Sequence, residues 1–228
     1  MYTLNAILLQ TAAATATTSA TQEISLWDLC LKGGIVMIPL LLLLLVSIYV
    51  LVERLLAIRG AAKEDSTFMK RIKDYIIDGE IESAHRLCKN TNTPYARLID
   101  KGISRIGRPT EEVQYAIENI GNIEIARLEK GFPWLATSAA VAPMIGFLGT
   151  VTGMVKAFYS LASAGGGANI TILAGGIYEA LVTTVAGLIV GIIALCAYNL
   201  LVARVNKVMT SLESKAMEFM DLLNEPAK

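Results

Sequence analysis

The sequence has few of the residue types that usually build catalytic or metal sites. Its 228 residues include three cysteines and one histidine. Cys30, Cys88 and Cys196 lie far apart, and the last is in an apolar segment, so neither a disulfide framework nor a metal site is expected. His85 has no second ligand near it in the sequence and is interpreted as an ordinary surface or packing residue. No nucleophile–base pair appears, and the glycines at 165–167 lack the Lys-Ser/Thr that follows in a phosphate-binding loop. We therefore expect no enzymatic activity, no metal and no cofactor.

Charged residues are also scarce. They make up 18% of the chain, against about 25% in ordinary soluble domains, whereas hydrophobic residues make up 54%. This composition is typical of a membrane protein with one modest polar region. Lysine plus arginine and aspartate plus glutamate balance at 20 each, so the net charge gives no reason to expect a nucleic-acid partner.

The chain does contain three long apolar runs, at residues 35–52, 132–155 and 170–202. About 20 apolar residues are enough for a helix to cross the hydrocarbon layer of a membrane. The first run has six consecutive leucines and is expected to be a lipid-facing anchor. The second has many small and hydroxyl residues, which favour close packing of membrane helices, and Pro143 is expected to bend it. The sequence thus predicts an all-α, three-span membrane protein.

The polar stretch between the first two runs, residues 53–131, has helical periodicity throughout. Turn signals divide it into several helices. No clear breaker precedes Gly131, so the last of these helices is expected to run on into the membrane, with a kink at Pro133. The remaining segments are expected to be an N-terminal tail with an interfacial segment at 1–34, a short loop at 156–169 and a C-terminal helix at 203–228.

The positive charges predict the orientation of the chain. Fourteen of the twenty lysines and arginines lie within residues 54–130, and four more follow Val202. Because cytoplasmic flanks carry the excess of positive charge, both regions are expected to be cytoplasmic. With three spans, the N-terminus is then outside, which in a bacterium is the periplasm. A cleaved leader is the alternative interpretation of the N-terminal tail.

Glu179 is the one acid inside the third run, where a carboxylate costs roughly 2.5–3.5 kcal/mol unless it faces protein or a wet cavity. Counting about 1.5 Å per residue from the outer ends of the spans puts Thr150 roughly 9 Å deep and Glu179 about 10 Å deep. Thr184 is expected about 7–8 Å deeper. Around the helix, Thr183 is about 40° from Glu179, and Thr184 about 140°. We expect these side chains to line a wide, partly polar passage between several helices.

Each of these residues also has a plain structural interpretation. Glu179 would stay protonated in a low-dielectric site and hydrogen-bond a neighbour to fix the packing. Thr150 and Thr184 would bond the carbonyl four residues earlier, as hydroxyls in membrane helices commonly do. Such a bond is compatible with lining a passage.

Two segments, AVAPMIGFLGTVTGM and GGIYEALVTTVAGLIVGIIA, resemble the MotA/TolQ/ExbB proton-channel family, and specifically its ExbB branch. The resemblance covers about residues 35–212. It implies that Thr150, Glu179 and Thr184 are pore residues. Thr183 stands where relatives often have alanine, so its hydroxyl is an extra candidate for the pathway. Lys156 replaces a more usual neutral polar residue near the outer mouth.

The resemblance also implies an assembly and a role. Members of the ExbB branch form a homopentamer around a dimer of single-span ExbD-like subunits, in the bacterial inner membrane. They pass energy from the ion gradient to a TonB-like protein that drives transport across the outer membrane. A TolQ-like or gliding-motility motor of the same family, and a membrane scaffold without ion flow, are the alternatives. The residues leave open whether the ion is a proton or sodium, and which motion, partners and cargo are involved.

Overall fold

The computed structural model describes residues 33–62, 67–163 and 170–224, and all regular structure within these ranges is helical. Three helices are long and apolar enough to cross a membrane. They are α3 (Met37–Ala61), α8 (Phe132–Ser163) and α9 (Ile170–Asn224). Four shorter helices lie between α3 and α8, namely α4 (Phe68–Ile77), α5 (Ile81–Thr91), α6 (Pro94–Ile103) and α7 (Thr110–Leu128). The predicted fold class, an all-α membrane protein, is confirmed.

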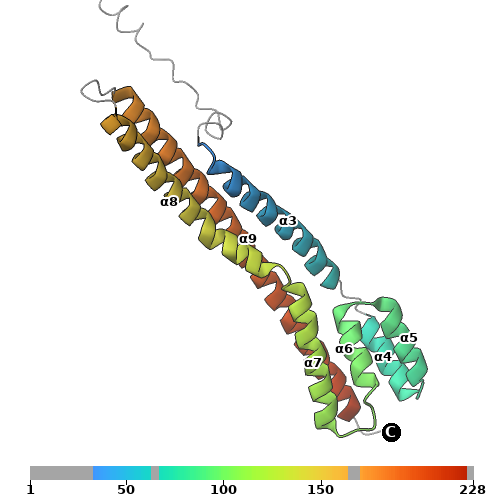
Figure 1. Cartoon of the computed structure of the whole chain (residues 1–228). Helices are drawn as coiled ribbons and strands as arrows, with labels where there is room; N and C mark the ends of the chain where they lie inside the picture. The colour runs from blue at the N-terminus through green and yellow to red at the C-terminus, as the bar shows by residue number, and fades with distance from the viewer. Residues whose placement is uncertain (1–32, 63–66, 164–169, 225–228) are drawn as a thin grey trace, which may run out of the picture.

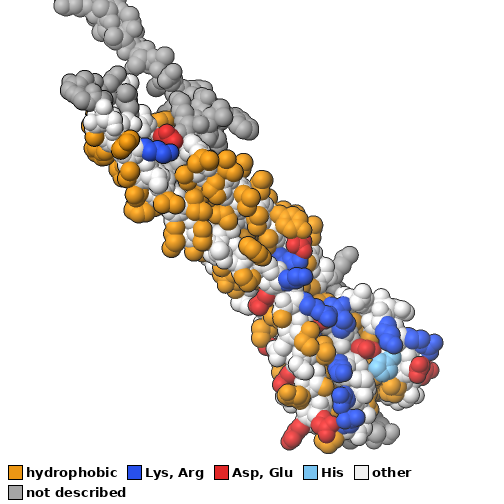
Figure 2. All heavy atoms as spheres, viewed as in Figure 1, with side chains coloured by type: hydrophobic (Ala, Val, Ile, Leu, Met, Phe, Trp, Pro, Cys, Tyr) orange, Lys and Arg blue, Asp and Glu red, His pale blue; other side chains and the backbone are white. Residues whose placement is uncertain are grey.

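The molecule is elongated. Helices α8 and α9 form a long antiparallel hairpin with α3 beside it, and α7 lies along the C-terminal half of α9 (Figure 1). Helices α4, α5 and α6 cluster at the same end of the molecule as α7. The space-filling view shows hydrophobic side chains over the long helices, whereas lysine, arginine, aspartate and glutamate gather over the shorter ones (Figure 2). The apolar and polar parts of the sequence therefore form separate parts of one molecule.

Helix boundaries differ from the predictions in two places. Helix α8 runs to Ser163 rather than ending near residue 155, so part of the predicted loop at 156–169 is helical. The predicted helix from Pro109 into the membrane is interrupted, since α7 ends at Leu128 and α8 begins at Phe132. Gly131 between them has φ +96°, a left-handed conformation that glycine adopts at little cost. The third apolar run and the predicted C-terminal helix at 203–228 form one continuous helix as far as Asn224, the last described residue.

Helix α8 contains two prolines, Pro133 and Pro143. Pro133 is the second residue of α8, where its missing N–H breaks no helical hydrogen bond. Pro143 lies within α8, and the helix continues through it. The residues of the predicted N-terminal tail at 1–32, and of the loop at 164–169, lie outside the described ranges.

Helix α9 joins the apolar and polar parts of the molecule. Phe219, near its end, is fully buried in the core formed by the short helices, together with Ile72, Ile99 and Ile117. A Cβ atom on Gly102 of α6 would lie 2.5 Å from the Phe219 ring and 3.0 Å from Ile117, so this position has room only for glycine. The C-terminal end of the long helix is thereby anchored in the polar part.

Candidate functional site

Helices α8 and α9 touch backbone to backbone through a row of glycines. A Cβ on Gly146 would lie 2.9 Å from the Thr183 carbonyl oxygen and 3.1 Å from the Gly187 Cα. About two turns further along α8, a Cβ on Gly153 would lie 2.9 Å from the Ala180 Cβ. Small residues at such contacts let membrane helices approach closely. This contact fixes how the polar residues of the two helices face one another.

Three threonine hydroxyls lie within hydrogen-bonding distance of the Gly146 carbonyl oxygen at this contact. Thr150 Oγ1 donates to it at 3.2 Å and Thr184 Oγ1 at 3.1 Å, while the longer contact from Thr183 Oγ1 is 3.4 Å. The hydroxyls of Thr150 and Thr184 also hydrogen-bond each other across the two helices. The structure thus brings together two of the three residues that the resemblance implied as pore residues, and adds a backbone acceptor that sequence reasoning missed.

The threonine pair has both donor and acceptor capacity. Each hydroxyl carries one proton and two acceptor lone pairs. One hydroxyl can donate to the other while the second donates to Gly146, and three of the four hydroxyl lone pairs are then unused within the pair. Both side chains are half-buried rather than enclosed. Such a pair can pass a proton along its hydrogen bonds or present neutral oxygens to a cation.

The plain structural interpretation holds in part. Thr150 does bond the carbonyl four residues earlier, as back-bonding predicts. Thr184 instead bonds a carbonyl of the other helix. Thr183 is 2% exposed, and its hydroxyl donates to Ala180 O at 2.7 Å. Its side chain packs against Gly149, where an added Cβ would lie 2.8 Å from the Thr183 Cβ. Its hydroxyl is therefore occupied within the helix contact.

Glu179 lies apart from the threonine pair. Its side chain is exposed on the isolated chain, and its Oε1 atom occupies the space that a Cβ on Gly34 would need. Gly34 has φ +63° and precedes the first turn of α3. The carboxylate is thus at the start of α3, whereas Thr184 faces α8, in agreement with their predicted 140° separation.

The predicted depths are wrong in one respect. Thr150 was expected level with Glu179, but it is level with Thr184, to which it is hydrogen-bonded. Glu179 is five residues before Thr184 and so about 7–8 Å away along the axis, toward the segment that joins α8 to α9. The cause is the greater length of α8, which shifts the register of the hairpin by more than one turn. Lys156 accordingly lies inside α8 and not at its end.

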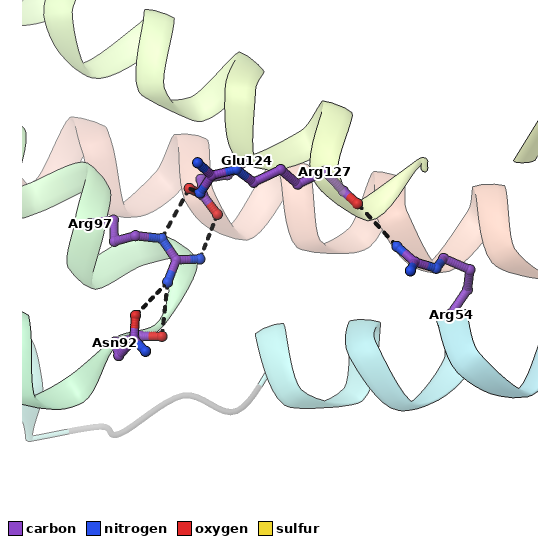
Figure 3. A network of polar contacts seen from close by, with 5 residues as sticks. All are labelled: Arg54, Asn92, Arg97, Glu124 and Arg127. Carbon is purple, nitrogen blue, oxygen red and sulfur yellow. Dashed lines mark hydrogen bonds and ion pairs between the residues drawn. The ribbon is translucent and has the colours of Figure 1, made fainter. Parts of the chain in front are cut away.

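A polar network that the sequence did not predict lies where the long helices meet the short ones. Glu124 of α7 is 3% exposed, and its carboxylate accepts hydrogen bonds from Arg97 Nε at 2.9 Å and from Arg127 Nη1 at 2.7 Å. Arg97 also donates to the Asn92 backbone carbonyl at 3.0 Å, and Arg54 of α3 donates to the Arg127 carbonyl at 3.2 Å. Figure 3 shows these contacts joining α3, α5, α6 and α7. Arg54, Arg97 and Glu124 are at least 27 residues apart in sequence, so no local motif could reveal the whole network.

The remaining titratable candidates are structural. His85 Nδ1 is 2.7 Å from Asp100 Oδ1, a contact between α5 and α6. Burial, and secondarily the Asp100 charge, raise the pKa of the Cys88 thiol from 9.0 to about 12. No group of three or more histidine, cysteine or acidic side chains within the described ranges is arranged to hold a metal ion.

Comparison with known proteins points to one family. The profile of the MotA/TolQ/ExbB proton channel family matches residues 90–214. An ExbB-like biopolymer transport protein of Synechocystis is 32% identical over 201 residues, covering 87% of this chain and 76% of its own length. The Tol-Pal system protein TolQ of Haemophilus influenzae is 33% identical, covering 91% of this chain and 97% of its own.

The chain belongs to the MotA/TolQ/ExbB proton channel family. The matched region includes both helices that carry the threonine pair. The resemblance to the ExbB branch is confirmed at the level of an ExbB-like member. A biopolymer transport protein ExbB of Neisseria meningitidis is 28% identical over 77% of this chain, so relatives named ExbB and relatives named TolQ both match. The family is one of proton channels and not of enzymes.

Proposed function

We propose that this chain is the channel and stator subunit of an inner-membrane motor that couples the ion motive force to TonB-dependent transport. In this proposal five copies surround a dimer of single-span ExbD-like subunits, and a TonB-like protein receives the energy. Membership of a proton channel family supports the passage of ions. The excess of positive charge in residues 54–130 and after Val202 supports a cytoplasmic location for the short helices and the C-terminus.

The observation that carries the proposal is the threonine pair of α8 and α9 on the Gly146 carbonyl. Both hydroxyls are only half-buried, and they keep oxygen lone pairs that water or an ion could contact. We propose that Thr150 and Thr184 contact the ion pathway and that Glu179 contacts it closer to the periplasmic mouth. Thr183, which is buried against Gly149, supports the pair rather than lining the pathway.

Substitution of Thr150 tests the pathway. Thr150→Val keeps the shape of the side chain but removes the hydroxyl, whereas Thr150→Ser keeps the hydroxyl. Thr152→Val is the matched control, since Thr152 lies in the same helix and its hydroxyl bonds only Leu148 O and Gly149 O of that helix. In a strain lacking the native gene, Thr150→Val should reduce TonB-dependent iron–siderophore uptake at least about tenfold, as expected when one essential proton-transfer group is lost. Thr150→Ser and Thr152→Val should support growth.

The same strain separates the alternatives. A TonB role predicts that the deletion abolishes siderophore uptake and leaves resistance to detergents intact, whereas a TolQ-like role predicts detergent sensitivity with normal uptake. A scaffold without ion flow predicts that Thr150→Val and Glu179→Gln behave like the wild type as long as the complex assembles. Native mass spectrometry on the complex reports assembly, and any number of copies other than five would contradict the proposed stoichiometry.

A further inference from the structure

A groove runs between α7 and the C-terminal half of α9, in the polar part of the molecule. Its volume is about 650 Å³. The α7 wall runs from Gln114 to Ile125, and the α9 wall runs from Met209 to Asp221, with Leu98 of α6 contributing to the lining. The two helices lie side by side in Figure 1. The groove is remote from the threonine pair and takes no part in the ion pathway proposed above.

The groove has the length of a short helix. At 1.5 Å per residue, each wall spans roughly 16–18 Å, which is about three helical turns. Its apolar lining comes from both walls, and Ile125 and Ala216 are the partly exposed aliphatic residues in it. An amphipathic helix of about three turns could lay its apolar stripe along such a surface.

Methionines make up an unusual share of one wall. Met209, Met217 and Met220 all line the groove, and the first two are 39% and 62% exposed. Methionine is unbranched and polarisable, and it adapts to the shape of a bound partner. Exposed methionines in a groove are typical of surfaces that bind helices.

The charges along the groove are of one sign. Glu118, Glu213 and Asp221 line it, whereas none of its described lining residues is lysine or arginine. This bias stands out in a chain whose acidic and basic residues are equal in number. Gln114 donates to Glu118 at 2.8 Å, which satisfies one oxygen without neutralising the charge. Glu213 and Asp221 are eight residues apart on α9, so their side chains lie about two turns apart along the helix and about 80° apart around it.

We propose that this groove binds a basic amphipathic helix of a partner protein, about three turns long. Its apolar stripe would cover the methionine wall, and lysines or arginines on its flanks would meet Glu118, Glu213 and Asp221. Helix α4 of a second copy of this chain is not available for this role. The basic helix α4 buries its apolar face in its own core, with Phe68 2% exposed and Ile72 0% exposed.

A peptide-binding experiment tests the proposal on the full-length chain in nanodiscs of zwitterionic lipid. The probe is a fluorescent 12-residue peptide with a leucine stripe flanked by lysines, and the control peptide has the same composition in scrambled order. The triple variant Glu118→Gln, Glu213→Gln and Asp221→Asn removes the charges of the groove without changing its shape. Binding to lipid is the same for both proteins, so the difference between them reports the groove.

The peptide should bind the wild type at least about tenfold more tightly than the triple variant, with a gap that narrows as salt is raised. The scrambled peptide should show no difference between the two proteins. Equal affinity of the helical peptide for wild type and variant would overturn the proposal. Circular dichroism and gel filtration establish that the variant is folded.

Photo-crosslinking in cells tests what occupies the groove. A crosslinker at Met217 should give a heterologous product that is lost in the triple variant, whereas one at Ile77, similarly exposed at 66% but on α4, should not. A product from Met217 that contains only two copies of this 24.5 kDa chain would mean that a second copy covers the groove, and the proposal would be wrong.

Discussion

Two glutamates of α7 have the same chemistry but very different surroundings. The side chain of Glu124 is 5% exposed and is held by Arg97 and Arg127, whereas Glu112 is 53% exposed and pairs only with Arg108, four residues earlier. Water solvates each exposed charge almost as well as the oppositely charged partner does. An exposed ion pair therefore contributes at most about 1 kcal/mol to the free energy of unfolding. A buried carboxylate with several charged donors contributes more.

Glu124→Gln should therefore lower the free energy of unfolding by about 2 kcal/mol, since it weakens charged hydrogen bonds and leaves two arginines without their counter-charge. Glu112→Gln should change it by less than about 0.5 kcal/mol. Thermal denaturation of the purified chain, followed by circular dichroism at 222 nm, measures both. Equal stability of the two variants would mean that the network in Figure 3 contributes nothing to folding.

Cys88 gives a prediction on pH. Its thiol is 1% exposed, and burial together with Asp100 raises its pKa from 9.0 to about 12. Since the folded protein holds this proton more tightly than the unfolded chain, the contribution of Cys88 to stability is complete below pH 9 and is lost as the pH rises toward about 12. With Cys88→Ala, the free energy of unfolding should fall less steeply between pH 9 and about pH 12.

The same shift predicts slow thiol chemistry. Three pKa units leave the native thiol with about a thousandfold less thiolate at pH 8 than an exposed cysteine has. In a variant with Cys30→Ser and Cys196→Ser, maleimide labelling of Cys88 should be at least that much slower in the native protein than after denaturation. Fast labelling of the native protein would show that α5 opens readily.

At the scale of secondary-structure elements, the close contact between α8 and α9 depends on glycines, which have no side chain to hold the two helices apart. Gly146 meets backbone atoms of α9, which cannot move aside as the end of a flexible side chain can. Gly175, in the same hairpin, has nothing within 4 Å of its Cβ position. The two glycines therefore differ only in whether a methyl group has room.

Gly146→Ala should cost about 1–3 kcal/mol of stability because the added methyl group forces the helices apart. Gly175→Ala should be neutral or stabilising by up to about 1 kcal/mol, since alanine favours the helix. Melting temperatures in detergent compare the variants. Because the separation of α8 and α9 would also break the bond between Thr150 and Thr184, Gly146→Ala should in addition reduce activity, whereas Gly175→Ala should not.

At the scale of the whole molecule, the distribution of charge gives a prediction on orientation. Residues 54–130 and the chain after Val202 together carry 18 of the 20 lysines and arginines. A green fluorescent protein fused after Lys228 should therefore fluoresce, and alkaline phosphatase fused there should be inactive. Alkaline phosphatase fused after Ser163, at the opposite end of α8, should be active. An active phosphatase after Lys228 would reverse the predicted orientation.

Much of the fold could be read from the sequence. The three spans follow from long apolar runs, because the cost of placing polar groups in lipid is additive along a segment. The orientation prediction follows from counting the lysines and arginines in the segments that flank the spans. The continuation of α9 to Asn224 follows from its regular apolar stripe. The two threonines that the family resemblance implied as pore residues came from a motif, and the helices do bring Thr150 and Thr184 together.

Other features depended on how segments far apart in sequence pack together. The depth of Thr150 relative to Glu179 depends on the glycine contacts that set the register of α8 against α9, and counting residues along each span could not supply it. The burial of Glu124 between Arg127 of its own helix and Arg97 of α6, and the acidic groove lined by α6, α7 and α9, arise only from contacts between helices. Hydrophobicity and charge are properties of a segment, but register, burial and shape belong to contacts between segments.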